Sequence, residues 1–146
     1  MITEHQGDLF TDAPLGASLA HCVSADLAMG KGIALTFKKR FQQLDVLHDQ
    51  QPQVGATLVL PNPEVHGAYV FYLVTKERAF DKPSLRSLAA ALDALREACR
   101  VRGVTTLAMP RIGTGLDRLD WADVRRLLEA AFAGSGIALR VYRVTE

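Results

Sequence analysis

The sequence predicts one α/β domain, residues 1–146, in which a mixed, largely parallel sheet has helices on both faces. Hydrophobic residues along the chain switch repeatedly between the spacing of a buried strand and that of a helix. The length is usual for one domain, and 49% hydrophobic with 23% charged residues is ordinary for a packed globular protein. Strands that alternate with helices of ten or more residues form parallel sheets covered on both sides, a three-layer α/β/α fold.

The charge balance, with 17 Lys plus Arg against 16 Asp plus Glu, gives the chain no overall field that would attract a polyanion. Any phosphate binding must therefore be local. Cys22 and Cys99 have neither a close partner cysteine nor a histidine cluster beside them, so we expect no metal and interpret both as small buried hydrophobic residues. The lack of a signal peptide and of an apolar run of about 18 residues predicts a cytoplasmic protein without membrane contact.

Six short stretches are predicted to be strands, and most of them are apolar and bounded by turn residues. The strongest is residues 68–75 (AYVFYLVT), where the density of β-branched and aromatic residues is typical of a strand covered on both faces. The expected strands are residues 2–6, 18–23, 56–60, 68–75, 105–109 and 137–144.

Helices are predicted where apolar residues recur every three or four positions. The first begins near Gly30 and is followed by a shorter piece. Pro83 is expected in the first turn of a long helix that ends at Gly103. Asp120 is expected to cap a last helix that ends near Gly134. The residues predicted to point inward are Ile33, Phe37, Phe41, Leu44 and Leu47, then Leu85, Leu88, Leu92, Leu95 and Cys99, and finally Trp121, Val124, Leu127, Leu128 and Ala131.

Two glycine pairs follow predicted strands, where ligands of parallel sheets bind. In residues 24–34 (SADLAMGKGIA), Gly30 and Gly32 stand at a helix N-terminus, which favours a phosphate; two glycines in an ordinary tight turn are the alternative. Residues 110–120 (PRIGTGLDRLD) carry a second pair, Gly113 and Gly115. If both loops lie at one edge of the sheet, their N–H groups can surround a diphosphate without a cluster of Lys and Arg.

The loop at residues 75–83 (TKERAFDKP) leaves the strongest predicted strand, and Lys76 stands at that strand's end. Most lysines are solvated surface residues, but one in a desolvated site can act as a nucleophile. Phe80 in the same loop could stack on a ring or merely pack.

Four aspartates are acidic candidates. Asp8 follows the first strand, Asp26 lies in the first glycine loop, Asp117 lies just past the second, and Asp120 is better explained as the helix cap. His21 lies inside an apolar strand, where a core histidine with satisfied hydrogen bonds is the simpler interpretation.

Taken in order, these segments resemble the macrodomain family, and more closely its subgroup of protein-directed terminal ADP-ribose glycohydrolases. The matching motifs are GDLF at residues 7–10, SLAHCVSADLAMGKGIALTFKKRF at 18–41, YLVTKERAFDKP at 72–83 and MPRIGTGLDRLDW at 109–121. The resemblance covers nearly the whole chain. It implies a macrodomain fold and ADP-ribose as the ligand, with no cofactor.

The resemblance also implies roles for particular residues. Asp8 occupies the place of the aspartate that accepts a hydrogen bond from adenine. Lys76 and Asp117 occupy the places of a catalytic lysine that attacks C1 of the distal ribose and an aspartate that transfers protons. The residues placed around ADP-ribose are Asp8, Leu9, His21, Ser24, Met29, Gly30, Lys31, Gly32, Ile33, Ala34, Pro110, Arg111, Ile112, Gly113, Thr114, Gly115 and Leu116.

The implied reaction is hydrolysis of the ester between ADP-ribose and a Glu or Asp side chain of a modified protein, by a monomeric enzyme. O-acetyl-ADP-ribose is a further substrate that the same groups could hydrolyse. The string MGKGIA also resembles an antitoxin macrodomain that removes ADP-ribose from thymidine in single-stranded DNA, so modified DNA is the alternative substrate. A reader that binds ADP-ribose without cleaving it is a third possibility.

Overall fold

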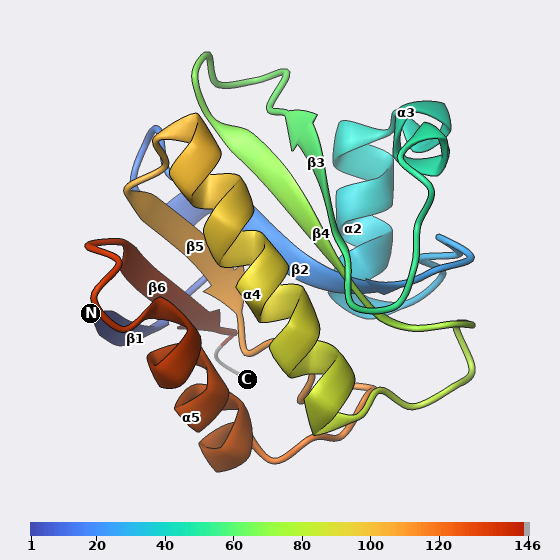
Figure 1. Ribbon diagram of the computed structural model, residues 1–146. Coiled ribbons are helices and arrows are strands. Elements are labelled where there is room, and N and C mark those ends of the chain that lie inside the picture. The colour runs from blue at the N-terminus through green and yellow to red at the C-terminus, as the bar shows by residue number, and fades with distance from the viewer. Residues whose placement is uncertain (145–146) are drawn as a thin grey trace.

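The computed structural model describes residues 1–144, so the last two residues of the predicted domain lie outside the described part. One six-stranded sheet runs through the molecule in the order β1-β6-β5-β2-β4-β3 (Figure 1). All neighbouring strands are parallel except β3, which pairs antiparallel with β4, so the predicted mixed, largely parallel sheet is confirmed. The strands are β1 (Ile2–Gln6), β2 (Ser18–Ser24), β3 (Thr57–Pro61), β4 (Tyr69–Lys76), β5 (Thr106–Pro110) and β6 (Ala138–Arg143).

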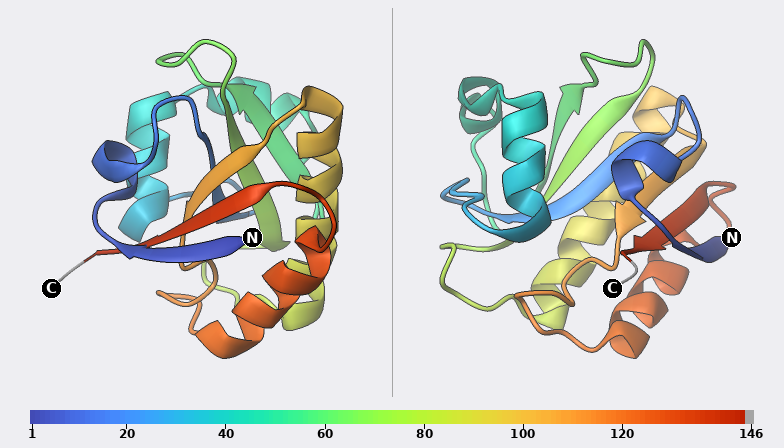
Figure 2. Two further views of the ribbon diagram at one scale, coloured as in Figure 1. Left: turned by 90° about the vertical axis from the view of Figure 1, so that its left-hand side faces the viewer. Right: turned by 180° about the vertical axis from the view of Figure 1, so that it is seen from behind.

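Helices cover both faces of this sheet, which is the predicted three-layer arrangement (Figure 2). One hydrophobic core lies between the sheet and the helices α4 (Leu85–Arg102) and α5 (Trp121–Phe132). The other lies on the opposite face, under α1 (Leu9–Asp12), α2 (Gly32–Phe41) and α3 (Leu44–Asp49). Six consecutive residues of β4, from Val70 to Thr75, are buried because this strand is covered on both sides.

Several predicted boundaries need correction. Pro83 does not lie in the first turn of α4: the helix begins at Leu85, and Ser84 caps it in a capping box with Ser87. Leu85 is 38% exposed and does not point inward. Cys99 is buried as predicted, whereas Cys22 is only partly buried. The short helix α1 was not predicted, because four residues are too few to show a helical period.

Strand direction decides where the predicted loops meet. Because β1, β2, β4 and β5 belong to one parallel set, their carboxyl ends point to the same edge of the sheet. The loops that follow β2, β4 and β5 therefore leave from one edge, as the right-hand view in Figure 2 shows.

Among residues 1–144, no helix combines the length and the apolar character that a membrane crossing needs.

Candidate functional site

The two glycine loops meet at that edge. A Cβ atom added to Gly32 would lie 3.7 Å from Cδ1 of Leu116 in the other loop. Gly32 and Gly113 have φ angles of 61° and 76°, which glycine adopts at little cost. The condition set by the sequence analysis, that both loops lie at one edge of the sheet, is therefore met.

Both loops present backbone N–H groups without an acceptor inside the described part of the chain. In the first loop these are the amides of Gly30, Gly32, Ile33 and Ala34, at the start of α2, where Lys31 gives no side-chain cap. In the second loop they are the amides of Gly113, Gly115 and Leu116. Unused amides at a helix N-terminus and in a facing turn are a favourable environment for an anion.

The first loop keeps an unusual backbone. Leu27 and Met29 have φ angles of 53° and 43°, a region in which a residue with a side chain is strained by about 1–3 kcal/mol. Their side chains are 2% and 4% exposed, packed into the core on the α2 face. Burial of two apolar side chains offsets the strain and so holds the loop in a shape that exposes its amides.

Lys76 and Asp117 form an ion pair at the same edge. Lys76 Nζ lies 2.6 Å from Asp117 Oδ1, and the two side chains are 14% and 17% exposed. A charge pair so little exposed to water interacts more strongly than a surface pair. The side chains predicted to carry chemistry are therefore in direct contact, although 41 positions separate them in the chain.

A β-bulge directs Lys76 toward this contact. Val23 of β2 pairs with Val74, but the next residue, Ser24, pairs with Lys76, so Thr75 is the extra residue of β4. An extra residue on one strand changes which face of the sheet the following side chains point to. Lys76 thus reaches the loop after β5, where Asp117 lies.

The charges of Asp117 and Lys76 both act on the thiol of Cys22. Burial, assisted by the negative charge of Asp117 and opposed by the positive charge of Lys76, raises its pKa to about 12. At neutral pH this cysteine is a neutral thiol, which is a poor nucleophile.

The described residues contain no group of three or more His, Cys, Asp and Glu that could hold a metal ion.

Asp8 is exposed and caps α1, since its Oδ1 accepts a hydrogen bond from the amide of Phe10 at 2.7 Å. Its own amide donates to Asp12 Oδ2, also at 2.7 Å. The cap uses one carboxylate oxygen of Asp8 and fixes the direction of the side chain.

The sequence model of the Macro domain family matches residues 20–128 of this chain. The chain belongs to the macrodomain family. It is similar to the ADP-ribose glycohydrolase OARD1 of Homo sapiens, with 45% identity over 97% of this chain and 90% of that protein. A DNA ADP-ribosyl glycohydrolase of Mycobacterium tuberculosis is 30% identical over 90% of this chain and 39% of that protein. A solved structure of the Mycobacterium tuberculosis DarG macrodomain superposes with a TM-score of 0.86 at 28% identity, covering 99% of both chains.

Several predicted contact residues of this macrodomain have buried side chains. Leu9, Met29 and Ile112 are 2–4% exposed and lie in the two cores, so only their backbone can face a ligand. Ser24 is 4% exposed, and its hydroxyl donates to Asp26. Among the predicted contact residues in the two loops, those that are exposed are Gly30, Lys31, Gly32, Gly115 and Leu116.

His21 requires two corrections. It is fully buried, so in this structure it offers no surface to a ligand. It lies in the core as the simpler interpretation held, but neither ring nitrogen has a hydrogen-bond partner among residues 1–144. Its ring stacks on Phe37, with centroids 3.7 Å apart, and packs edge-on against Tyr72.

The buried imidazole predicts a pH-dependent stability. Burial lowers the pKa of His21 to about 3. The unfolded chain binds this proton below about pH 6.5 and the folded protein does not, so His21 makes the free energy of unfolding fall by about 1.4 kcal/mol per pH unit as the pH drops from 6.5 toward 3. His21→Leu is expected to remove this contribution, which urea unfolding at pH 7 and pH 5 would measure. A variant with the same loss between the two pH values as the native chain contradicts it.

Glu4 is a site-proximal residue that the sequence did not indicate. Its carboxylate accepts hydrogen bonds from Arg111 at 3.1 Å and from the indole of Trp121 at 3.0 Å, and it also pairs with Arg125. Burial works to raise its pKa, but these three donors hold the pKa below its ordinary value. Through Arg111, Glu4 ties β1 to the start of the second glycine loop. Contacts between residues 107 positions apart leave no pattern in the sequence.

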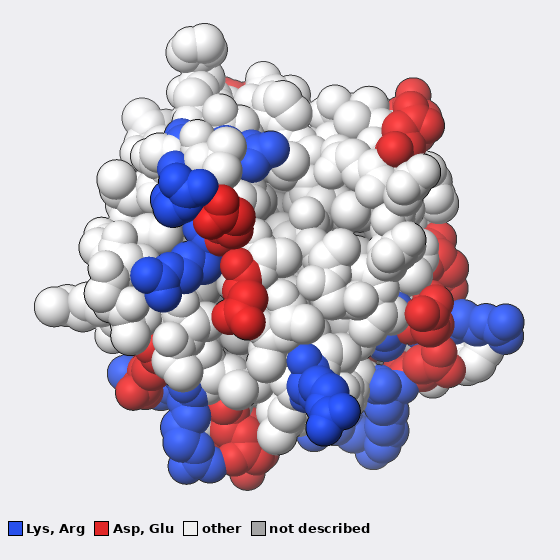
Figure 3. Space-filling view, in the orientation of Figure 1, with Lys and Arg blue, Asp and Glu red and all other residues white. Residues whose placement is uncertain are grey.

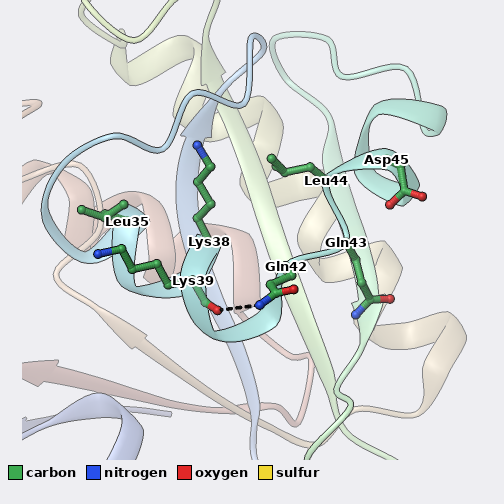
Figure 4. A pocket seen from close by; sticks show the side chains of 7 residues that line it. All are labelled: Leu35, Lys38, Lys39, Gln42, Gln43, Leu44 and Asp45. Atoms are coloured by element: carbon green, nitrogen blue, oxygen red, sulfur yellow. Dashed lines mark hydrogen bonds between the residues drawn. The ribbon is translucent and has the colours of Figure 1, made fainter.

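Two hollows are lined by residues outside the two glycine loops, although Lys38, which lines the first, donates to the carbonyl of Ala28 at 3.0 Å. One, of about 560 Å³, lies between α2 and α3 and is lined by residues such as Leu35, Lys39 and Leu44 (Figure 4). The other, of about 330 Å³, is lined by residues 14–18 and 102–106 among others, where β2 and β5 begin. None of the residues around either hollow belongs to the loops after β4 or after β5 at the carboxyl ends.

Proposed function

We propose that this macrodomain is an ADP-ribosyl hydrolase, which binds ADP-ribose and releases it from modified Glu or Asp side chains of proteins. The observation that carries the proposal is the contact of Lys76 Nζ with Asp117 Oδ1 at 2.6 Å, beside two loops with unused amides. The 45% identity to a relative named ADP-ribose glycohydrolase supports the same activity.

Backbone amides are the proposed diphosphate ligands. The amides of Gly30 to Ala34 lie at the positive end of the α2 dipole, and those of Gly113, Gly115 and Leu116 face them from the other loop. Neutral N–H donors can surround a diphosphate without a cluster of Lys and Arg, which agrees with the net charge of +1. Asp8, held by its cap to Phe10, is the proposed acceptor for the adenine amino group through its remaining carboxylate oxygen.

The proposed chemistry uses the lysine as a nucleophile. A lysine attacks only as a free amine, and Asp117 is close enough to accept the proton that Lys76 must lose. Nζ then bonds to C1 of the ring-closed distal ribose while the bond from C1 to the ester oxygen breaks, so the protein carboxylate leaves. The glycosylamine that forms loses its extra proton, and its ring opens to give an imine at C1. Water next cleaves the C–N bond, which returns free ADP-ribose and the amine.

A side-by-side turnover assay tests the substrate. The native protein is offered a glutamate-modified protein, an oligonucleotide with ADP-ribosyl thymidine, and O-acetyl-ADP-ribose, and released ADP-ribose is measured. We expect the fastest release from the modified protein and slower hydrolysis of O-acetyl-ADP-ribose. Tight ADP-ribose binding without any product over hours would make the protein a reader and contradict the hydrolase.

Modified DNA is the second candidate substrate, because relatives named DNA ADP-ribosyl glycohydrolase reach 30% identity. The charge distribution favours the protein substrate. On the face covered by α4 and α5, which Figure 3 shows, acidic and basic side chains are interspersed, and the chain as a whole carries a net charge of only +1. A single-strand groove combines a basic track with stacking aromatics. Release from the oligonucleotide alone would decide for DNA.

Binding through amides predicts different effects at two glycines of one loop. Gly115→Ala is expected to weaken ADP-ribose binding at least ten-fold, because the methyl group blocks close approach to the amide, with little change in stability since the new Cβ meets nothing within 4 Å. Gly113→Ala is expected to lower the free energy of unfolding by about 1–3 kcal/mol, because its φ is 76° and the new Cβ would lie 3.0 Å from Leu119. Calorimetry and urea unfolding measure the two effects. Unchanged affinity in Gly115→Ala contradicts the proposed contact.

We also propose that the protein acts as a monomer in the cytoplasm. Large exposed apolar side chains such as Leu15, Val54 and Val101 come from different segments of the chain, namely the loop before β2, the loop before β3 and helix α4. Both cysteines are free thiols, as is usual in a reducing compartment.

A further inference from the structure

The carboxylate of Asp26 joins two loops of the site. Its Oδ1 accepts hydrogen bonds from the hydroxyl of Ser24, the last residue of β2, and from the amide of Ala28 at 3.1 Å, in the loop that follows. Its Oδ2 accepts from the amide of Ala79 at 3.1 Å, in the loop after β4. One side chain thus connects segments that are 53 positions apart in the sequence.

Two backbone hydrogen bonds extend this connection. The amide of Ala25 donates to the carbonyl of Lys76 at 2.8 Å, and the amide of Asp26 donates to the carbonyl of Glu77 at 3.2 Å. The segment from Lys76 to Ala79, which we call the lysine strap, is therefore bound to the loop after β2 at three successive points. The first of these points is the carbonyl of Lys76 itself.

The lysine strap needs this support because the sheet no longer provides it. Ser24 and Lys76 form the last pair of the ladder between β2 and β4, just after the bulge at Thr75. The side chains of Glu77, Arg78 and Ala79 are exposed, so no core packing fixes the strap. Its position depends on hydrogen bonds.

The charge of Asp26 fits this role. Partial burial works to raise its pKa, but hydrogen bonds from Ser24, Ala79 and Ala28, together with the positive charge of Lys76, hold the pKa below the ordinary value. Asp26 is thus ionised at neutral pH, and both carboxylate oxygens are acceptors. Hydrogen bonds to an ionised acceptor are about twice as strong as neutral ones.

We propose that Asp26 is a positioning residue for the hydrolase reaction, which fixes the lysine strap and so keeps Lys76 Nζ in contact with Asp117. The inference rests on the proposed function, since it assigns Asp26 a part in the step that Lys76 performs. Asp26 acts through Lys76 and is not proposed to touch the reacting atoms. A reacting group displaced by about 1 Å can lose about 100-fold in rate, so loss of the tether affects the chemical step.

Asp26→Asn tests the tether with little change of shape. The asparagine oxygen can still accept from Ser24 and Ala28, but its NH₂ group cannot accept from Ala79. We expect kcat for ADP-ribose release to fall at least ten-fold, while the ADP-ribose affinity measured by calorimetry stays within two-fold. Trapping the lysine adduct of free ADP-ribose with cyanoborohydride, at saturating ADP-ribose, should slow by a similar factor.

Asp81→Asn is the matched control. Asp81 lies in the same loop and accepts from the amide of Arg78 at 3.1 Å, but that bond is local and does not reach the loop after β2. Its kcat is expected to stay within two-fold of the native value. Asp26→Asn with a native kcat, or with equal losses of kcat and of affinity, would overturn the positioning role. A native protein without any turnover would instead overturn the proposed function.

Discussion

Lys76→Met is expected to reduce the release of ADP-ribose from a glutamate-modified protein at least about 1,000-fold. Methionine keeps much of the length of the side chain but has no amine that can attack C1 of the ribose, and loss of a nucleophile removes most of the rate enhancement. The diphosphate contacts proposed for the two glycine loops do not involve this side chain, so the affinity for ADP-ribose should fall less than ten-fold. Product chromatography gives the rate and calorimetry the affinity.

Lys82→Met is the control for that experiment, because Lys82 lies exposed in the same loop and makes no ion pair within residues 1–144. It should keep the native rate. If Lys76→Met still released ADP-ribose at the native rate, the nucleophile would have to be sought elsewhere, and the ion pair with Asp117 would be structural.

Asp117→Asn is expected to lower kcat about 100-fold. The amide oxygen can still accept a hydrogen bond from Lys76, so the geometry of the 2.6 Å contact can persist, but an amide cannot take up the proton that the lysine must lose. Single-turnover measurements with saturating enzyme separate this chemical step from binding.

Combining Asp117→Asn with Lys76→Met tests whether the two residues act as a unit. Groups that serve one step are non-additive, so the double variant should be no slower than Lys76→Met alone. Losses that multiply, or an Asp117→Asn variant with native kcat, would mean that Asp117 does not assist the lysine.

The arrangement of the sheet was open to prediction because it depends on local patterns. The spacing of Leu88, Leu92 and Leu95 marks one buried helical face, and all three are fully buried. The dense apolar run of residues 68–75 marks a central strand, and β4 lies between β2 and β3. Once the strands are known to be parallel, their carboxyl ends must share an edge, which is why the meeting of the glycine loops could be expected.

Features that depend on pairing between distant segments escaped prediction. The bulge at Thr75 results from the register between β2 and β4, and no property of Thr75 alone indicates it. The tether from Asp26 to Ala79 and the cluster around Glu4 likewise depend on which loops are brought together. Asp26 was recognised as an acidic residue in a glycine loop, but its partners became evident only from the fold.

The buried positions of Leu27 and Met29 have a consequence for how the loop can vary. If main-chain N–H groups hold the ligand, then the neighbouring side chains can be replaced without loss of binding. The condition is that the buried apolar side chains of Leu27 and Met29 keep the backbone in its unusual turn. Related sequences can then differ in these amino acids and still present the same backbone surface to the ligand. The DarG macrodomain, which shares 28% of its residues with this chain yet superposes with a TM-score of 0.86, shows that the framework beneath such a surface tolerates extensive replacement.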